Sequence, residues 1–146
     1  MNCNIYLRNT VAYIPTMGKM DEGFYRAVEP VAVVSVAHTE ALRQALEGAI
    51  RRGNPPVPML KRSEWAPPIL LKYAGVKSWS AFERGMQLWD LNEKNGIYQI
   101  AGNTKQPNGM WKEAAEQTTT FPPHTSTDDV IERTIAILQD AARDNT

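Results

Sequence analysis

The sequence predicts an α+β fold, in which a mainly antiparallel sheet is packed by two or three helices. Three observations lead to this prediction. The first 37 residues are rich in strand-forming types, two distant segments carry apolar residues at helical spacing, and an Asn-Gly pair in the second half marks a β-hairpin. The 146 residues suit one domain, so we expect a single globular domain over 1–146, with an N-terminal strand region and a C-terminal three-stranded meander.

The N-terminal strand region is predicted from short runs of β-branched and aromatic residues. These runs are Asn4–Leu7, Val11–Ile14 and Gly23–Val28. Pro15 and Gly18 are expected to end the second run, and Glu29-Pro30 is expected to interrupt the chain after the third. The next run, Val31–Ala37, is apolar on both faces of the pleat, which predicts a central strand covered on both sides.

Two helices are predicted from capping residues and apolar stripes. Thr39 is expected to cap the first helix, and Gly53 follows it as the stop. The second begins at Ser126 or Thr127, and two aspartates after the cap place negative charge in its first turn. The buried stripes are expected to be Leu42, Ala45, Leu46, Ala49 and Ile50 in the first helix, and Ile131, Ile135, Leu138 and Ala142 in the second.

The middle of the chain holds a proline-rich connector and a segment that periodicity leaves open. Asn54–Pro58 is a stiff connector, and Pro67-Pro68 favours a short helix through Ile69–Ala74 that Gly75 ends. Large apolar residues over 78–86 recur at three- and four-residue intervals, as in a helix, yet the same residues also fit a strand. Both structures remain open for this segment.

The C-terminal meander is predicted from its turns. Asn95-Gly96 is typical of a type I′ turn, because both central positions of that turn need positive φ. Ile97–Ile100 should therefore run antiparallel to Gln87–Leu91. Pro107-Asn108-Gly109 marks a second turn, after which Met110–Thr120 is predicted to form the third strand.

Charge and composition exclude some classes of function. Sixteen basic and sixteen acidic residues cancel, but residues 1–77 carry a net charge of +4 and residues 78–146 one of −4. This polarity argues against a nucleic-acid binder and permits either an acidic face for a basic protein partner or a chance imbalance.

No apolar run approaches the roughly 20 residues that span a bilayer, and no secretory signal is recognisable. The single cysteine, Cys3, allows no internal disulfide, so we expect a cytoplasmic protein without a membrane partner.

Residues suited to catalysis or metal binding do not cluster along the chain. His38, His124 and Cys3 share no ligand-like spacing, and each histidine is expected to be solvated or capping at a helix entry. Gly18-Lys19 lacks the Ser/Thr and the first glycine of a phosphate-binding loop, and no nucleophile elbow or dinucleotide motif is present. We therefore expect no catalytic residue, no cofactor and no metal, and a protein that is not an enzyme.

The four tryptophans and one pair of carboxylates are the remaining candidates for a site. Trp89 and Trp111 lie beside the predicted turns and could form a partner-binding face, although burial in the core is the commoner role of indoles. Glu113 and Glu116 are three residues apart in a predicted strand, so their side chains should face opposite sides and make a poor catalytic pair.

Several short stretches between residues 69 and 139 form a recognisable series. They are Ile69-Leu70-Leu71, Gly75–Phe82, Trp89–Tyr98, Gly109-Met110-Trp111, Phe121-Pro122 and Val130–Arg133. This half of the chain resembles the immunity proteins of bacterial polymorphic toxin systems, particularly those of contact-dependent growth inhibition.

The resemblance implies a small cytoplasmic protein that binds one cognate toxin domain, in many cases a nuclease, and blocks its active site. Such proteins are often acidic, and the overall neutral charge of this chain departs from that pattern. The implied interface consists of Trp89, Asp90, Glu93, Trp111, Glu113 and Glu116. Two alternatives are a small enzyme whose site is built from scattered carboxylates and His124, and a structural or adaptor domain of a larger complex.

Overall fold

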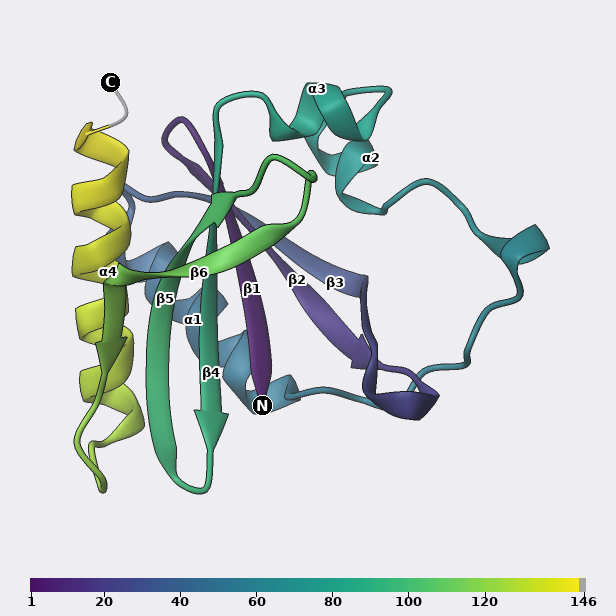
Figure 1. The fold of residues 1–146 in the computed structure, drawn as a ribbon. Coiled ribbons are helices and arrows are strands. Elements are labelled where there is room, and N and C mark those ends of the chain that lie inside the picture. The colour runs from purple at the N-terminus through teal and green to yellow at the C-terminus, as the bar shows by residue number, and fades with distance from the viewer. Residues whose placement is uncertain (145–146) are drawn as a thin grey trace.

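The computed structural model describes residues 1–144, without the side chains of Glu22 and Arg62, and contains one six-stranded antiparallel sheet (Figure 1). The strands are β1 (Asn2–Arg8), β2 (Val11–Lys19), β3 (Tyr25–Ser35), β4 (Met86–Lys94), β5 (Ile97–Lys105) and β6 (Trp111–Thr120). Their order across the sheet is β3-β2-β1-β4-β5-β6, so β3 and β6 are the edges. The N-terminal strands and the C-terminal meander confirm the predicted α+β class.

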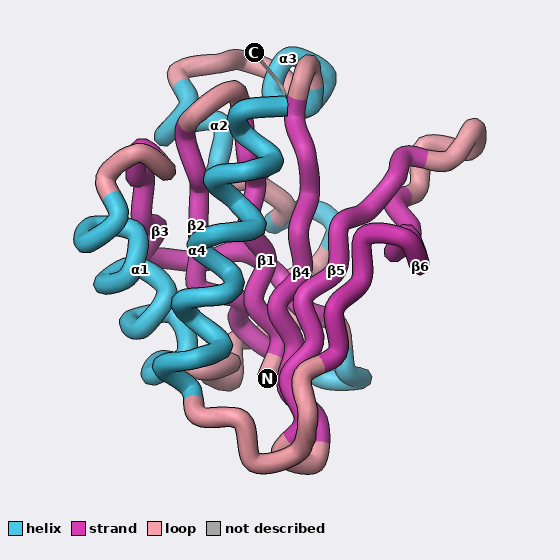
Figure 2. Tube along the Cα trace, turned by 90° about the vertical axis from the view of Figure 1, so that its left-hand side faces the viewer, coloured by secondary structure: helices cyan, strands magenta, loops and turns pink. Residues whose placement is uncertain are grey.

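Helices lie on both sides of this sheet. They are the longer α1 (Thr39–Arg52) and α4 (Thr127–Asp144), the short α2 (Leu70–Ala74) and α3 (Trp79–Glu83), and the 3-10 turns η1 (Asp21–Gly23) and η2 (Arg62–Glu64). Helices α1 and α4 lie side by side against one face of the sheet, here called the first face (Figure 2). Helices α2 and α3 pack against part of the opposite side, the second face.

The first face carries the larger hydrophobic core. Alternate residues of β1 and β2 point into it, and Ile5, Leu7 and Ile14 are fully buried there. They pack against the apolar stripes of the two long helices, in which Leu46 and Leu138 have no exposed surface. Both helices and their buried stripes agree with the sequence prediction, apart from Ala45 and Ile50, which are only partly buried. The predicted cap of the first helix was wrong, because Thr39 is the first residue of α1 and its Oγ1 accepts a hydrogen bond from Gln139 of α4.

The second face carries a smaller aromatic core under α2 and α3. Phe82 is fully buried and meets the rings of Tyr6 and Tyr13 edge-on, with centroid distances of 5.7 and 5.6 Å. Trp79 stacks on Phe82 at 5.0 Å. This core covers only part of the second face, so the rest of that face is free to carry polar side chains.

The predicted ends of the N-terminal strands were wrong at two prolines. Strand β2 continues through Pro15 and Gly18, and β3 continues through Pro30. The ladder between β2 and β3 shifts register between Pro15 and Thr16, and such a bulge tolerates a residue without an N–H group. Gly18 has a structural role in the strand, because a Cβ there would lie 2.6 Å from Cγ1 of Val57.

The prediction that Val31–Ala37 is a central strand was also wrong. Residues up to Ser35 belong to the edge strand β3, and Val33 is 44% exposed. The continuous apolar pattern has another cause, since Val34 packs against the core of the first face while Val31 packs against that of the second. Partial cover on both faces therefore gives an edge strand the sequence of a central one.

The open segment 78–86 resolves into a helix followed by a strand. Ser78 caps α3 by accepting a hydrogen bond from the Ala81 N–H at 3.1 Å, and β4 begins at Met86. The hairpin after β4 is confirmed, because Asn95 and Gly96 both have positive φ.

Strand β6 bends sharply in its middle. Ala101 of β5 pairs with Thr118, but Asn103 pairs with Glu113, so residues 114–117 of β6 form an extended bulge. The first half of β6 then crosses in front of the neighbouring strands (Figure 1). This bend places Glu113 over the second face of the sheet.

Candidate functional site

A row of polar side chains runs across the part of the second face that α2 and α3 leave uncovered. In the cross-strand register, Asn4 of β1 lies opposite Asp90 of β4, and Asn2 lies opposite Asn92. Directly opposed residues share one face of an antiparallel sheet. The same strands bury apolar side chains on the first face, so the polar row is a consequence of the two-residue period.

Hydrogen bonds join polar side chains of the second face into two groups, and the groups meet where Asn103 lies directly opposite Glu113 in the sheet. Asn103 Nδ2 donates to Asp90 Oδ2 at 3.1 Å, and Gln99 Nε2 donates to Glu113 Oε2 at 3.1 Å. Thr120 Oγ1 in turn donates to Gln99 Oε1 at 3.1 Å. We call Asp90, Gln99, Asn103, Glu113 and Thr120 the polar cluster.

The polar cluster contains two carboxylates without a basic partner. Neither Asp90 nor Glu113 forms an ion pair with any residue that the structure describes. Burial raises the pKa of Asp90 to about 6, the hydrogen bond from Asn103 opposes that rise, and the nearby charge of Glu113 adds to it. The ionised form of Asp90 is therefore poorly stabilised by its surroundings, and a positively charged group placed beside it would stabilise that form.

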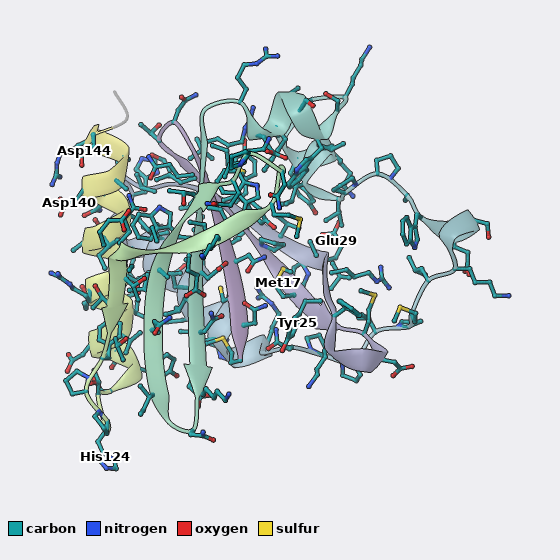
Figure 3. All side chains as sticks on the ribbon, in the orientation of Figure 1. Met17, Tyr25, Glu29, His124, Asp140 and Asp144 are labelled. Atoms are coloured by element: carbon teal, nitrogen blue, oxygen red, sulfur yellow. The ribbon has the colours of Figure 1, made fainter. Side chains whose placement is uncertain are left out.

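Beside the polar cluster the second face is hollowed into a groove of about 880 Å³. Strands β2 and β3 form its floor, and the connecting segment 54–69, here called the strap, forms its outer wall. The lining is mostly apolar and includes Met17, Met20, Tyr25, Met59, Trp65 and Ile69. Figure 3 shows Met17, Tyr25 and Glu29 together on the side of β2 and β3 that looks toward the strap.

The strap is anchored firmly where it begins. The Asn54 side chain accepts from Asn2 N and donates to the carbonyls of Asn2 and Met17, all at 2.8 Å. Lys19 N donates to Pro55 O at 2.8 Å, and Val57 N donates to Lys19 O at 2.9 Å. These bonds tie the first four residues of the strap to β1 and β2.

The middle of the strap, by contrast, presents large apolar side chains to solvent. Met59 is 44% exposed and Trp65 is 67% exposed. The Trp65 Nε1 group donates to Leu60 O at 3.3 Å, a bond within the strap itself. At its far end Ile69 packs against the core of the second face. The strap is thus held at both ends over an apolar groove.

Groove and polar cluster belong to one continuous surface. Asn4 and Tyr6 of β1 line the groove, and Asn4 lies directly opposite Asp90 in the sheet. Asn4 Nδ2 also donates to the Tyr6 hydroxyl at 3.3 Å. The second face therefore offers an apolar half and a polar, carboxylate-bearing half side by side, as the core and rim of a protein interface do.

The structure separates the residues that sequence analysis placed in one interface. Asp90, Trp111 and Glu113 lie on the second face, Trp111 packing partly buried against its core. Trp89 lies in the core of the first face and is only 7% exposed.

Two further residues of the predicted interface, Glu93 and Glu116, make no hydrogen bond to the polar cluster in the part of the chain that the structure describes. Glu93 has the same parity as Trp89 along β4, and its Oε1 accepts from Gly96 N in the hairpin turn at 2.8 Å. Glu116 is exposed within the bulge of β6. The sheet therefore separates Trp89 and Glu93 from Asp90, Trp111 and Glu113.

The alternative built on His124 finds no cluster of groups around that residue. His124 is exposed at the turn before α4, far along the molecule from Met17, Tyr25 and Glu29 (Figure 3). Within residues 1–144, no group of three or more His, Cys, Asp and Glu side chains could hold a metal ion. Cys3 is buried in the core of the first face, where burial raises the pKa of its thiol to about 12.

Sequence analysis missed the groove and three of the five residues of the polar cluster. Gln99, Asn103 and Thr120 were not singled out, although polar residues that alternate with apolar ones in a buried strand are a usable signal for a face without cover. The groove had no comparable signal, because its two walls are about 40 residues apart in the sequence.

Comparison with known proteins gives the class of the fold. No protein-family model and no curated protein matches the chain. A chain of a CdiA-CT/CdiI toxin and immunity complex from Yersinia pseudotuberculosis has a similar structure, with a TM-score of 0.65 at 10% identity over 95% of each chain. A protein of unknown function from Neisseria meningitidis has a TM-score of 0.64 at 11% identity, over 96% of this chain and 93% of its own.

These likenesses show that the three chains share one α+β fold over nearly their whole lengths. The particular arrangement is a six-stranded antiparallel sheet with two long helices on one face and a partly uncovered second face. Within residues 1–144, no helix is both long and apolar enough to cross a membrane.

Proposed function

We propose that this chain is an immunity protein, which binds a cognate bacterial toxin domain in the cytoplasm and neutralises it without catalysing a reaction. The observation that carries the proposal is the shared fold with a chain of a toxin and immunity complex over 95% of both chains. The series of residues between 69 and 139 that resembles immunity proteins supports it independently.

The second face is the part of the surface best suited to bind the toxin. Its groove supplies apolar area that a partner can cover, including the exposed side chains of Met59 and Trp65. Its polar cluster supplies Asp90 and Glu113, whose charges no described residue neutralises. A toxin domain with a basic surface, such as a nuclease, would complement these two carboxylates.

The proposal can be tested by calorimetric titration with the C-terminal domain of the polypeptide encoded immediately upstream. We expect one-to-one binding that silences the toxicity of that domain in cells. Replacing Asp90 and Glu113 together by alanine should weaken binding at least tenfold, because the partner's basic groups would lose both carboxylates.

A matched control is Asp128→Ala, which removes an exposed carboxylate from α4 on the other side of the sheet. This variant should bind as the parent does. Absence of binding between two folded proteins would exclude that toxin as the partner. Equal affinities for the double variant and the parent would exclude the polar cluster from the interface.

A further inference from the structure

The middle of the strap, residues 59–66, forms a small unit that is bonded only to itself. The Trp65 Nε1 group donates to Leu60 O at 3.3 Å, and Glu64 N donates to Lys61 O at 2.8 Å. Among the groups that the structure describes, no hydrogen bond or ion pair joins this unit to any other part of the chain. The unit therefore lacks the kind of bonds that anchor the start of the strap.

Two proline-rich arms connect this unit to the sheet and to α2. Residues 55–58 contain three prolines, and Pro67 and Pro68 follow on the other side. Proline fixes its own φ and restricts the residue before it, so both arms are stiff. Movement is then concentrated at the two ends of the unit, near Met59 and Ala66, and the unit can swing as one piece.

The unit is amphipathic, and its apolar side is turned toward the groove. Four of its apolar residues line the groove, namely Met59, Leu60, Trp65 and Ala66. The exposed Lys61 and Glu64 are not part of that lining. Because the Trp65 Nε1 group already has its hydrogen-bond partner inside the unit, burial of this indole would leave no donor unpaired.

The opposite wall of the groove is also apolar. It includes Met17 of β2, Met20 in the turn after β2, and Tyr25 of β3. Trp65 and Met59, which are 67% and 44% exposed, lie across the groove from this wall. Removing apolar surface from water on both sides is favourable, and the covalent connection keeps the two surfaces at a high effective concentration. The flexible thioethers of the methionines can adapt to an indole placed against them.

We propose that the strap is a lid, which in the partner-free protein swings onto β2 and β3 and seats Trp65 against Met17, Met20 and Tyr25. The groove seen in the structure is the open position of this lid. Closure goes beyond the proposed immunity function, since it needs no toxin. If that function holds, closure also covers the apolar half of the second face until a partner displaces the strap.

The lid is tested by the emission and acrylamide quenching of Trp65 in the whole protein. The difference between the parent protein and Trp65→Phe isolates the signal of this indole. We expect blue-shifted emission and a quenching constant about threefold below that of free N-acetyltryptophanamide, because closure removes the indole from solvent. An indole that stays 67% exposed would instead emit and be quenched nearly as the free compound.

The seat of Trp65 is tested by Met20→Lys, which adds a charge to the wall of the groove at a partly exposed position. The emission of Trp65 should shift to the red, and its quenching constant should rise toward the value of the free compound, because the charge disfavours a buried indole beside it. The matched control is Met110→Lys, at a 65% exposed position before β6, which should leave the quenching of Trp65 unchanged. Circular dichroism verifies that both variants are folded.

Two results would overturn the proposal. One is quenching of Trp65 as a free indole in the folded parent protein, which would show that the strap stays open. The other is a protected Trp65 that Met20→Lys does not affect, which would show that the indole is covered somewhere other than the groove. Because no toxin is present in these measurements, neither result bears on the immunity function.

Discussion

The two faces of the sheet are made from the same strands but differ in what they bury. On the first face, Ile5, Leu7 and Leu91 are fully buried beneath α1 and α4. On the second face the same strands place Asn4, Tyr6 and Asp90 beside the groove and in the polar cluster. One face is a dry core, and the other is part core and part polar surface.

The first face therefore contributes mainly to the stability of the fold, whereas the exposed part of the second face is available for binding. Burial of apolar side chains on the first face is favourable by about 25 cal/mol per Å² and defines the fold. A partly buried carboxylate such as Asp90 instead costs free energy, and natural proteins retain such costs mainly where a partner or ligand uses the group. Changes on the two faces should therefore have opposite effects on stability.

The largest change in stability is expected from a substitution in the core of the first face. Leu138→Ala removes a fully buried side chain between α4 and the sheet, and should lower the free energy of unfolding by about 3 kcal/mol. Urea unfolding followed by circular dichroism measures this change. Ala136→Ser, at an exposed position of the same helix, should change stability by less than about 0.5 kcal/mol. A loss below about 1 kcal/mol for Leu138→Ala would mean that the first face is not the main core.

The second largest loss of stability is expected from a substitution of Asn54, which anchors the strap. Asn54→Ala removes three side-chain hydrogen bonds and leaves part-buried backbone groups of Asn2 and Met17 unpaired, at a cost of about 2 kcal/mol. Hydrogen exchange should become faster at Lys19 N and Val57 N, which bond between β2 and the strap.

A matched control for the anchor is Asn108→Ala. That side chain accepts one exposed bond from Met110 N, so its loss should cost no more than about 0.5 kcal/mol. Unchanged exchange at Val57 in Asn54→Ala would show that the strap is held by contacts other than this side chain.

Local signals account for the parts of the fold that the sequence predicted well. The apolar stripes of α1 and α4, the Ser126 cap of α4 and the Asn95-Gly96 turn act over a few residues, so their structures are fixed by near neighbours. The edge position of β3 could not be predicted in this way. Its apolar run reflects α1 on one side and the aromatic core on the other, and both of these contacts are remote in sequence.

The candidate site depended even more on long-range structure. Trp89 and Asp90 are adjacent in the sequence, yet they point to opposite faces, and only the packing of α1 and α4 decides which face is covered. The bulge over 114–117 likewise changes the relation between Glu113 and Glu116, and a pattern of alternation does not predict it. The groove arises only when the strap returns to β2 and β3.

Replacing the buried carboxylate of Asp90 should raise the free energy of unfolding, whereas truncating Leu138 should lower it. The pKa of Asp90 rises from 3.8 to about 6 on folding, so the folded state binds a proton more readily than the unfolded chain. Stability should fall as the pH rises from about 4 to about 6 and then stay level, because the carboxylate is ionised in both states above that window. Asp90→Asn removes the cost and should stabilise the protein by about 1 kcal/mol at pH 8, with little change at pH 4.

Thermal or urea unfolding at these two pH values measures the effect of Asp90→Asn. Asp128→Asn provides a matched control, because that carboxylate lies in the first turn of α4 and stabilises the helix. Its replacement should destabilise the protein by about 0.5 kcal/mol at pH 8. If Asp90→Asn destabilised the protein at pH 8 as well, the second face would be a structural core like the first, and the contrast between the faces would fail.

The smallest effect should come from Glu113→Gln, which keeps the hydrogen bond from Gln99 but removes the charge near Asp90. The pKa of Asp90 should move toward its ordinary value while stability changes by less than about 0.5 kcal/mol, and carboxyl carbon chemical shifts measured by NMR follow that titration.

Glu116→Gln, in the bulge of the same strand, should leave the titration of Asp90 unchanged. An unchanged titration in Glu113→Gln would mean that the bend of β6 does not bring the two carboxylates close, and the polar cluster would then reduce to Asp90 and Asn103. A clear shift would establish two coupled carboxylates on the second face, which is the arrangement that a basic partner can neutralise in one step.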